Sequence, residues 1–350
     1  MVIRSASIVE SKATQMGQTF GDVWVAPTGT TDSARLQAVL DACAGQYCVR
    51  LQPGVFRLRQ PITLRPGTRL FGSGSNTVLN CDPQELPAGP VSWLSNTEFG
   101  AGSQGNIEVC DMNIALTDPS RQQQTGIELG TGSSVPRSSF LHGVSFSRWT
   151  ANALLLNRCH ASKVARCAFY YCNATDGSAW AIRSDEQANG LTVNDCYLSS
   201  NDQQIRIEQF ASTRVLNNTF DSGGLPASHE QFWFNNGRAL HFEGNYVEKV
   251  QNADSYFLCR LWSVLGASIR TNYIQGEFSG SYYTWGFFRV ENSCSGINIC
   301  ENSLADPRVD GLYLSSSASD TRMVGNSYAW QGEQIQAVTA LSHMTGEFVS

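Results

Sequence analysis

Residues 49–79 read VRLQPGVFRLRQPITLRPGTRLFGSGSNTVL, and in this stretch Val, Leu, Phe and Ile recur at every second position between Pro-Gly and Gly-Ser turns. Alternation with a period of two is typical of β-strands that have one buried face. The turn signals keep each of these strands short. A chain that continues in this way predicts an all-β protein.

The composition agrees with an all-β protein and excludes several classes of function. Charged residues make up only 15% of the 350, and 31 glycines indicate many turns. The net charge is −6 and no run of basic residues is present, so we expect no nucleic-acid partner. The first residues lack the apolar stretch of a signal peptide, and no apolar run is long enough to cross a membrane. We therefore expect neither secretion nor membrane insertion.

The 11 cysteines show no paired CxxC spacing suited to zinc. We interpret most of them as small buried apolar residues of a chain that folds under reducing conditions, and we expect no metal ion and no cofactor. A local disulfide between Cys43 and Cys48 stays an open alternative.

Beyond Gly72 the chain repeats one short pattern. Apolar residues alternate with other residues, and the alternation ends at Asn or a small residue that is followed by an aromatic or aliphatic residue. Successive copies begin 23 to 30 residues apart, at Val144, Cys167, Asp195, Asn218, Asn245, Asn272, Asn302 and Asn326. A period of this size built from strands predicts a solenoid, since each repeat needs its neighbours to bury its apolar face. We predict a right-handed parallel β-helix in which equivalent residues stack about 4.8 Å apart. The recurring asparagines are expected to form a ladder of amide hydrogen bonds.

One helix is predicted, at about residues 32–44, because Leu36, Val39, Leu40 and Cys43 recur at helical spacing. Asp32 or Thr31 is expected to cap its first turn, and Gly45 to end it. An amphipathic helix here would cover the open end of the solenoid. We expect an N-terminal segment at 1–26, the β-helix domain at 27–330 and a C-terminal segment at 331–350.

The N-terminal part carries a family resemblance. Its segments are Phe20-Gly21, Thr31-Asp32-Ser33, LQAVLDA at 36–42, VRLQPGVFRL at 49–58, Ile62-Thr63-Leu64, Gly67-Thr68-Arg69-Leu70 and Gly72-Ser73-Gly74. They resemble the start of the pectate-lyase-like superfamily, which has the pectin lyase fold, and are similar to its branch of bacteriophage tailspike depolymerases. The rest of the chain matches the superfamily only in the spacing of its repeated strands.

The resemblance implies a right-handed parallel β-helix, usually a homotrimer, that binds and cuts polysaccharide on a lateral face. For a phage protein it implies a place on the virion tail. It supplies no catalytic residues, since the catalytic motifs of polygalacturonases, alginate epimerases and pectate lyases are absent.

The strands that follow the Asn turns allow candidate site residues to be named. Alternation sends every second side chain outward, and equivalent outward positions form columns along the solenoid. The first column is Arg183, Arg206, Trp233, Arg260 and Arg289; the second is Asp185, Glu208, Asn235, Trp262 and Glu291. Aromatic rings stack on pyranoses, and charged groups bind hydroxyls or carboxylates. We expect these columns to bind substrate, with aromatic residues walling the groove at Trp180, Tyr256, Tyr282, Tyr283 and Trp285.

Asp185 and Glu208 fall in one column on successive coils, so their carboxyl groups are expected about 5 Å apart, the separation in a retaining glycosidase. Repulsion at that distance would raise the pKa of one of them, leaving an acid and a nucleophile. Wider pairs of Glu208 with Glu230 or Asp254 would suit inversion. His229 is a minor candidate.

Other interpretations stay open for the same residues. The arginines and carboxylates would also suit a solvated salt-bridge ladder, and the tryptophans a subunit interface.

Three functions remain in view. The first is hydrolysis of a bacterial surface polysaccharide by a tailspike-type homotrimer, and the outward arginines favour an acidic polymer. The second is β-elimination in a uronic acid polymer, in which Arg206 or Arg260 neutralises the substrate carboxylate. The third is binding of sugar without catalysis.

Overall fold

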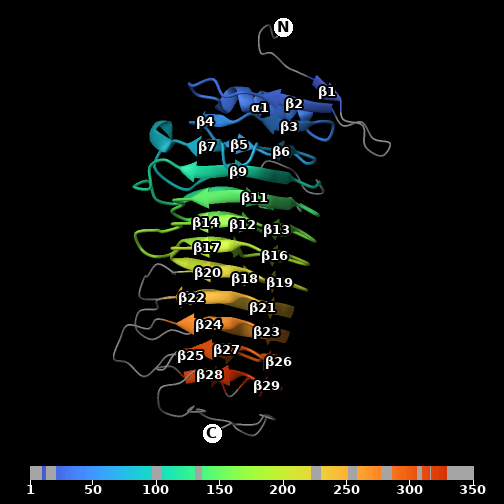
Figure 1. Cartoon of the computed structure of the whole chain (residues 1–350), viewed down its shortest axis with the longest axis vertical. Coiled ribbons are helices and arrows are strands. Elements are labelled where there is room, and N and C mark those ends of the chain that lie inside the picture. The colour runs from blue at the N-terminus through green and yellow to red at the C-terminus, as the bar shows by residue number, and fades with distance from the viewer. Residues whose placement is uncertain are drawn as a thin grey trace.

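The computed structural model describes residues 10–12, 21–96, 105–130, 136–221, 230–250, 258–276, 286–305, 310–315 and 317–328. These residues form a right-handed parallel β-helix, as predicted, whose coils stack from the N-terminal to the C-terminal end of one elongated body (Figure 1). Parallel pairing between successive coils is the rule, and β1 (Glu10–Lys12), which runs antiparallel to β2 (Gly21–Val25), is an exception.

The coils present three lateral faces. Face A consists of β5 (Ile62–Thr63), β8 (Val91–Ser95), β10 (Gln124–Leu129), β12 (Asn152–Leu156), β15 (Trp180–Ser184), β18 (Gln203–Glu208), the first halves of β21 (Phe232–Glu243) and β23 (Cys259–Arg270), β25 (Gly286–Glu291) and β28 (Asp310–Leu314).

Face B follows face A along each coil. It consists of β2, β3 (Cys48–Leu51), β6 (Arg69–Phe71), the first halves of β9 (Glu108–Leu116) and β11 (Phe140–Ser147), β13 (Lys163–Ala165), β16 (Thr192–Asn194), β19 (Arg214–Leu216), the second halves of β21 and β23, β26 (Ser295–Cys300) and β29 (Thr321–Val324).

Face C completes the coil. It consists of β4 (Gly54–Leu58), β7 (Thr77–Cys81), the second halves of β9 and β11, β14 (Ala168–Tyr170), β17 (Tyr197–Ser199), β20 (Thr219–Asp221), β22 (Tyr246–Val250), β24 (Tyr273–Gly276), β27 (Ser303–Ala305) and β30 (Ser327–Tyr328). A short 3₁₀ helix, η1 (Pro83–Glu85), lies between β7 and β8.

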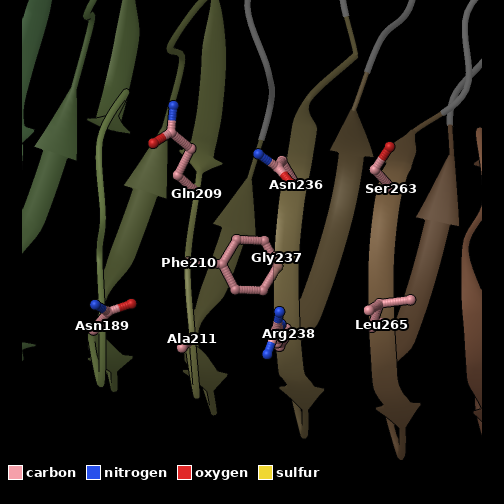
Figure 2. Close-up of a pocket in the computed structure, with 9 residues that line it drawn as sticks. All are labelled: Asn189, Gln209, Phe210, Ala211, Asn236, Gly237, Arg238, Ser263 and Leu265. Atoms are coloured by element: carbon pink, nitrogen blue, oxygen red, sulfur yellow. The ribbon is translucent and has the colours of Figure 1, made fainter.

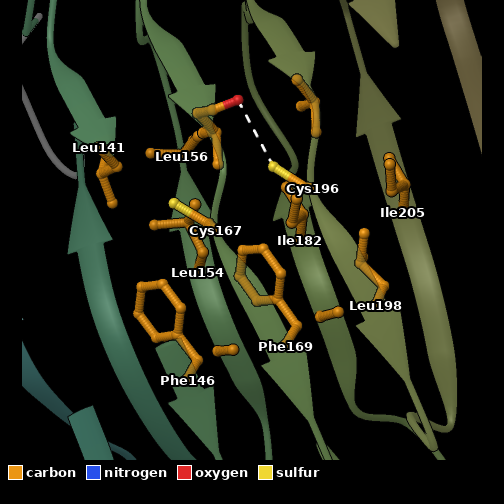
Figure 3. Close-up of a cluster of buried hydrophobic side chains, with 14 of the residues drawn as sticks. Leu141, Phe146, Leu154, Leu156, Cys167, Phe169, Ile182, Cys196, Leu198 and Ile205 are labelled. Atoms are coloured by element: carbon orange, nitrogen blue, oxygen red, sulfur yellow. Dashed lines mark hydrogen bonds between the residues drawn. The ribbon is translucent and has the colours of Figure 1, made fainter. Parts of the chain in front are cut away.

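The core fills the inside of the coils with stacked side chains (Figure 3). On face A, Leu154, Ile182 and Ile205 occupy equivalent inward positions on successive coils and are fully buried. On face C the rings of Phe146 and Phe169 stack with centroids 4.9 Å apart and planes inclined by 3°. Because like residues lie over like residues, the period-two pattern of each strand becomes one continuous apolar column.

The predicted asparagine ladder is confirmed at the turn between faces B and C. Each amide nitrogen donates to the amide oxygen of the next coil, from Asn218 to Asn245 over 3.0 Å and on through Asn272 and Asn302 to Asn326 over 2.8 to 2.9 Å. Each amide oxygen also accepts a backbone N–H of the preceding coil, as Asn272 Oδ1 does from Asn245 N over 2.9 Å. The ladder thus supplies hydrogen-bond partners for buried polar groups at a bend where pairing between strands does not supply them.

The helix α1 (Ser33–Cys43) lies at the N-terminal end of the solenoid, over β3 and β5 (Figure 1). Leu36 and Leu40 are buried as expected. The predicted side-chain cap is wrong, since Asp32 bonds none of the N–H groups of the first turn. Its buried carboxylate instead accepts from the backbone N–H and the hydroxyl of Thr28, at 3.1 and 2.9 Å, and so anchors the preceding loop.

All 11 cysteines are free, so the open alternative of a Cys43–Cys48 disulfide is not realised. Nine are buried, and burial raises the pKa of the Cys110 thiol to about 12. None of the described helices has the length and apolar character that a bilayer crossing requires. Strand β2 already stacks on β3 although it precedes residue 27, and residues 331–350 lie outside the described residues.

Candidate functional site

The two predicted columns exist and lie side by side on face A. The register pairs Arg183 with Arg206, and then Trp233, Arg260 and Arg289 on successive coils. The second column pairs Glu208, Asn235, Trp262 and Glu291 in the same order. Asp185 directly follows Ser184, whose partner Ile207 directly precedes Glu208, so Asp185 continues this column. The structure therefore brings all ten predicted residues onto face A.

Arg206 joins the two predicted catalytic carboxylates. Its Nε lies 2.7 Å from Oε1 of Glu208, which also accepts from Nη2, and 3.9 Å from Oδ1 of Asp185 on the preceding coil. Asp185 in turn accepts from Nε of Arg183 over 2.7 Å. The positive charge of Arg206 thus offsets the repulsion that we expected between the two carboxylates.

Arg260 and Arg289 are paired in the same way. Nε of Arg260 donates to Oε2 of Glu291 over 2.9 Å, and its Nη1 lies 3.4 Å from Oε1 of Glu230. Arg289 Nη2 lies 2.7 Å from Oε1 of Glu291. Both glutamates are buried, at 2% and 7% exposure. The four arginines of face A are therefore matched by four carboxylates, which agrees with the salt-bridge ladder left open from the sequence.

Guanidinium groups cover the indole of Trp233. Cζ of Arg206 and Cζ of Arg260 each lie 4.9 Å from its ring centroid, and they come from the coils before and after it. Arg260 also lies 4.6 Å from the ring of Trp262, and Arg206 6.0 Å from that of Trp180. A pyranose stacked on Trp233 would have to displace a guanidinium group, so the geometry does not favour the expected role of this residue as a stacking platform.

The predicted neighbours of the two columns fall into two groups. His229, Asp254, Tyr256, Tyr282, Tyr283 and Trp285 lie outside the described residues. Trp180 is described, but it is buried at 3% exposure instead of walling an open groove. Among the described residues, no group of three or more His, Cys, Asp and Glu side chains is placed to hold a metal ion.

A pocket of about 370 Å³ lies beside face A, at the turn that leads to face B (Figure 2). Sequence reasoning missed it. Its only sequence signal is Gly237, which occupies a position where the next coil has the buried Val264. The missing side chain leaves room for Phe210, because a Cβ on Gly237 would lie 2.1 Å from Cε1 of that ring.

A second groove, of about 620 Å³, runs over face C and was also missed. Tyr170 and Tyr171 border it, and Tyr171 is 58% exposed. Farther along the same face the Tyr197 hydroxyl donates to Oδ2 of Asp221 over 2.8 Å.

The side chain of Asp202 binds the backbone of a neighbouring coil. Oδ2 accepts the backbone N–H of Ala174 over 2.6 Å. Burial raises the pKa of this carboxyl to about 6, although the N–H groups of Ala174 and Ala179 oppose the rise. Asp202 precedes the first residue of β18, whereas Glu208 is the last residue of that strand, so the two lie at opposite ends of it.

Solved structures of distant sequence share this fold. The DFA-IIIase of Arthrobacter chlorophenolicus A6, without its lid and in complex with GF2, is 13% identical, with a TM-score of 0.65 over 93% of this chain and 92% of its own. The polygalacturonase of Erwinia carotovora ssp. carotovora is 13% identical, with a TM-score of 0.52 over 96% and 100%. The surface protein and adhesin PfbA of Streptococcus pneumoniae is 12% identical, with a TM-score of 0.55 over 93% and 96%.

No protein-family model matches the chain, and no curated protein matches it in sequence. At 12 to 13% identity these solved structures show the fold alone. The chain thus has the β-helix fold of these proteins, and its membership of the pectate-lyase-like superfamily and of the tailspike branch, expected from the sequence, stays a prediction.

Proposed function

We propose that the chain binds a polysaccharide along face A and cleaves it by glycoside hydrolysis, as a tailspike-type depolymerase of a bacterial capsule, exopolysaccharide or O-antigen. The observation that carries the proposal is the position of Asp185 and Glu208, two carboxylates on adjacent coils that both lie within 4 Å of Nε of Arg206. Paired carboxylates of this kind are what glycoside hydrolysis needs. The fold likeness to a polygalacturonase and to DFA-IIIase supports a carbohydrate substrate.

The arrangement suggests a role for each carboxylate. Glu208 is the better placed nucleophile, because two nitrogens of Arg206 hold its Oε1 in position. Glu208 would attack the anomeric carbon and form a glycosyl-enzyme ester, while Asp185 donates a proton to the glycosidic oxygen as the bond to the leaving sugar breaks. Water then attacks the glycosyl-enzyme ester at the anomeric carbon, Asp185 accepts the proton of that water, and Glu208 leaves as the carboxylate.

The test is to incubate the chain with a panel of purified capsular polysaccharides, exopolysaccharides and O-antigens and to weigh the fragments by mass spectrometry. Hydrolysis adds one water for each bond cut. Fragments that lack this water and absorb near the ultraviolet edge would instead demonstrate β-elimination. That alternative has less support in the structure, because Arg206 and Arg260 already pair with protein carboxylates.

Binding without cleavage is the second candidate. It is favoured by the arginine partners of Asp185, Glu208, Glu230 and Glu291, since a structural ladder would use the same residues. The likeness to an adhesin is consistent with it. A polymer that is retained by the protein yet keeps its length through a long incubation would establish this candidate over hydrolysis.

The proposal includes a homotrimer and, for a phage-encoded chain, a place on the virion tail. Both rest on the resemblance of residues 20–74 to tailspike depolymerases. Sedimentation equilibrium tests the first, with a mass three times the 38.2 kDa of the chain expected.

A further inference from the structure

The pocket beside face A is continuous with the second column of the proposed site. Gln209 follows Glu208 in the chain, Asn236 follows Asn235 and Ser263 follows Trp262, so the pocket begins one residue beyond that column (Figure 2). Gln209, Asn236 and Ser263 form one edge of it, and Ala211, Arg238 and Leu265 form the other. A polymer that lies on face A would therefore pass its rim.

The middle of the pocket is apolar and formed by residues held in place. Phe210 is buried at 3% exposure, and its ring packs edge-on against Phe234 with centroids 6.2 Å apart. Gly237 is buried beside it (Figure 2). Leu265 is 47% exposed on the rim, so an apolar contact is available to a ligand. The volume of about 370 Å³ falls in the range of pockets that take small ligands.

Arg238 supplies the charge of the pocket. It is the one charged residue among the described residues that line it, and it is exposed. None of the ion pairs among the described residues includes it, whereas the arginines of face A all have carboxylate partners. An unpaired guanidinium group binds a carboxylate through two parallel hydrogen bonds. The neighbouring amides of Asn189, Gln209 and Asn236 can exchange hydrogen bonds with hydroxyl groups.

We infer that this pocket determines specificity for an acidic sugar unit, whose carboxylate is bound by Arg238 while its ring lies against the exposed side chain of Leu265. The inference rests on the proposed function, because it takes the unit to belong to a polymer on face A. It assigns the recognition of acidic polysaccharide to Arg238 and not to the four paired arginines, to which the sequence pattern had pointed.

Two matched pairs of sugars test the inference by isothermal titration calorimetry. The first is β-1,4-linked tetraglucuronate and cellotetraose, which differ only by the carboxylate at C6. The second is tetragalacturonate and its carboxyl-reduced form. The wild type is expected to bind the acid of at least one pair about tenfold more tightly than its neutral partner, as for one charge-assisted hydrogen-bonded contact.

Three variants locate the effect. Arg238→Gln is expected to abolish the preference for the acid and to leave the affinity for the neutral sugar unchanged, whereas Arg238→Lys should keep part of the preference. Arg214→Gln is the matched control, because Arg214 is also exposed, pairs with none of the described carboxylates and lies on β19 outside the pocket. All four proteins are compared by circular dichroism and thermal unfolding.

Equal affinity for acid and neutral sugars in the wild type would overturn the inference and leave the proposed function standing. A preference for the acid that survives in Arg238→Gln would also overturn it. If none of the four sugars binds, the inference is wrong, and the polysaccharide panel decides separately whether the proposed function fails with it.

Discussion

Arg206 donates to Glu208 across 2.7 Å on face A of the β-helix. The two residues lie on one strand, two positions apart, so both side chains point outward and can meet. The same guanidinium group reaches Asp185 on the preceding coil and the ring of Trp233 on the following one. Arg206 therefore connects the proposed catalytic carboxylates with the ring of Trp233.

Replacing Glu208 with Gln is expected to lower the rate of polysaccharide cleavage by at least about a hundredfold, since a positioned carboxylate contributes that much or more. The variant keeps the size of the side chain, so binding should change little. Glu243→Gln is the control, because Glu243 also pairs with an arginine, Arg270 at 3.1 Å, but on face B. Full cleavage by Glu208→Gln, measured from fragment release, would remove Glu208 from the catalytic pair.

Replacing Trp233 with Leu is expected to lower the free energy of unfolding by about 2 to 4 kcal/mol, because the ring contacts of Arg206 and Arg260 are lost together with its packing. Its effect on polysaccharide affinity should be smaller than that of Trp262→Leu, for which we expect a loss of about tenfold. Denaturant unfolding and calorimetry separate the two effects. A larger loss of affinity in Trp233→Leu would mean that Arg206 or Arg260 moves aside for the sugar.

Replacing Asn272 with Ala is expected to lower the free energy of unfolding by about 3 to 5 kcal/mol. The substitution removes its bonds to Asn245, to Asn302 and to the carbonyl of Phe242, and leaves buried polar groups without partners. Asn298→Ala is the control, since Asn298 is exposed on β26 and should change stability by less than about 0.5 kcal/mol. Similar midpoints for both variants in denaturant would contradict a structural role for the ladder.

Asp202 should make stability fall as the pH rises from about 4 to about 6. Burial raises the pKa of its carboxyl from 3.8 to about 6, so in this range the folded chain keeps a proton that the unfolded chain has lost. The contribution of protonated Asp202 to the free energy of unfolding is therefore fully present below pH 4. About 2 to 3 kcal/mol is lost once Asp202 ionises above pH 6.

Asp202→Asn tests this dependence, because the amide oxygen can still accept from Ala174 N. The variant should lose this part of the decrease in unfolding free energy between pH 4 and pH 7. Asp195→Asn, at an exposed turn, should keep the decrease of the wild type. A pH profile of Asp202→Asn that matches the wild type would show that the carboxylate does not oppose folding when it ionises.

The alternation of residues 49–79 and the later period of 23 to 30 residues were enough to predict the fold, the asparagine ladder and the two columns of face A. The reason is geometric. In a parallel β-helix the hydrogen bonds between coils join equivalent positions, so a spacing of one period in the chain becomes a distance of one strand separation. Arg183 and Arg206, 23 residues apart, are for that reason register partners.

The period could not predict which groups the outward side chains contact. The position of Trp233 between Arg206 and Arg260 suggested a stacking surface, but long guanidinium side chains can lie over the ring of the adjacent coil and do so on both sides. Glu230 lies outside the named columns, yet it contacts Arg260 from inside the protein. Contacts of this kind depend on side-chain conformations, which sequence spacing does not encode.

The sequence by itself determined the order of the coils, because strand alternation and repeat length specify which residues stack. Only the tertiary structure decided where a cavity would lie and that Arg238, beside it, has no ion-pair partner among the described residues. The pocket at Arg238 exists because Phe210 on one coil fills the space that Gly237 leaves on the next, a match of shapes between positions 27 residues apart. Side-chain volume and charge are balanced among neighbours in space, so this part of the site became visible only after the chain had been folded.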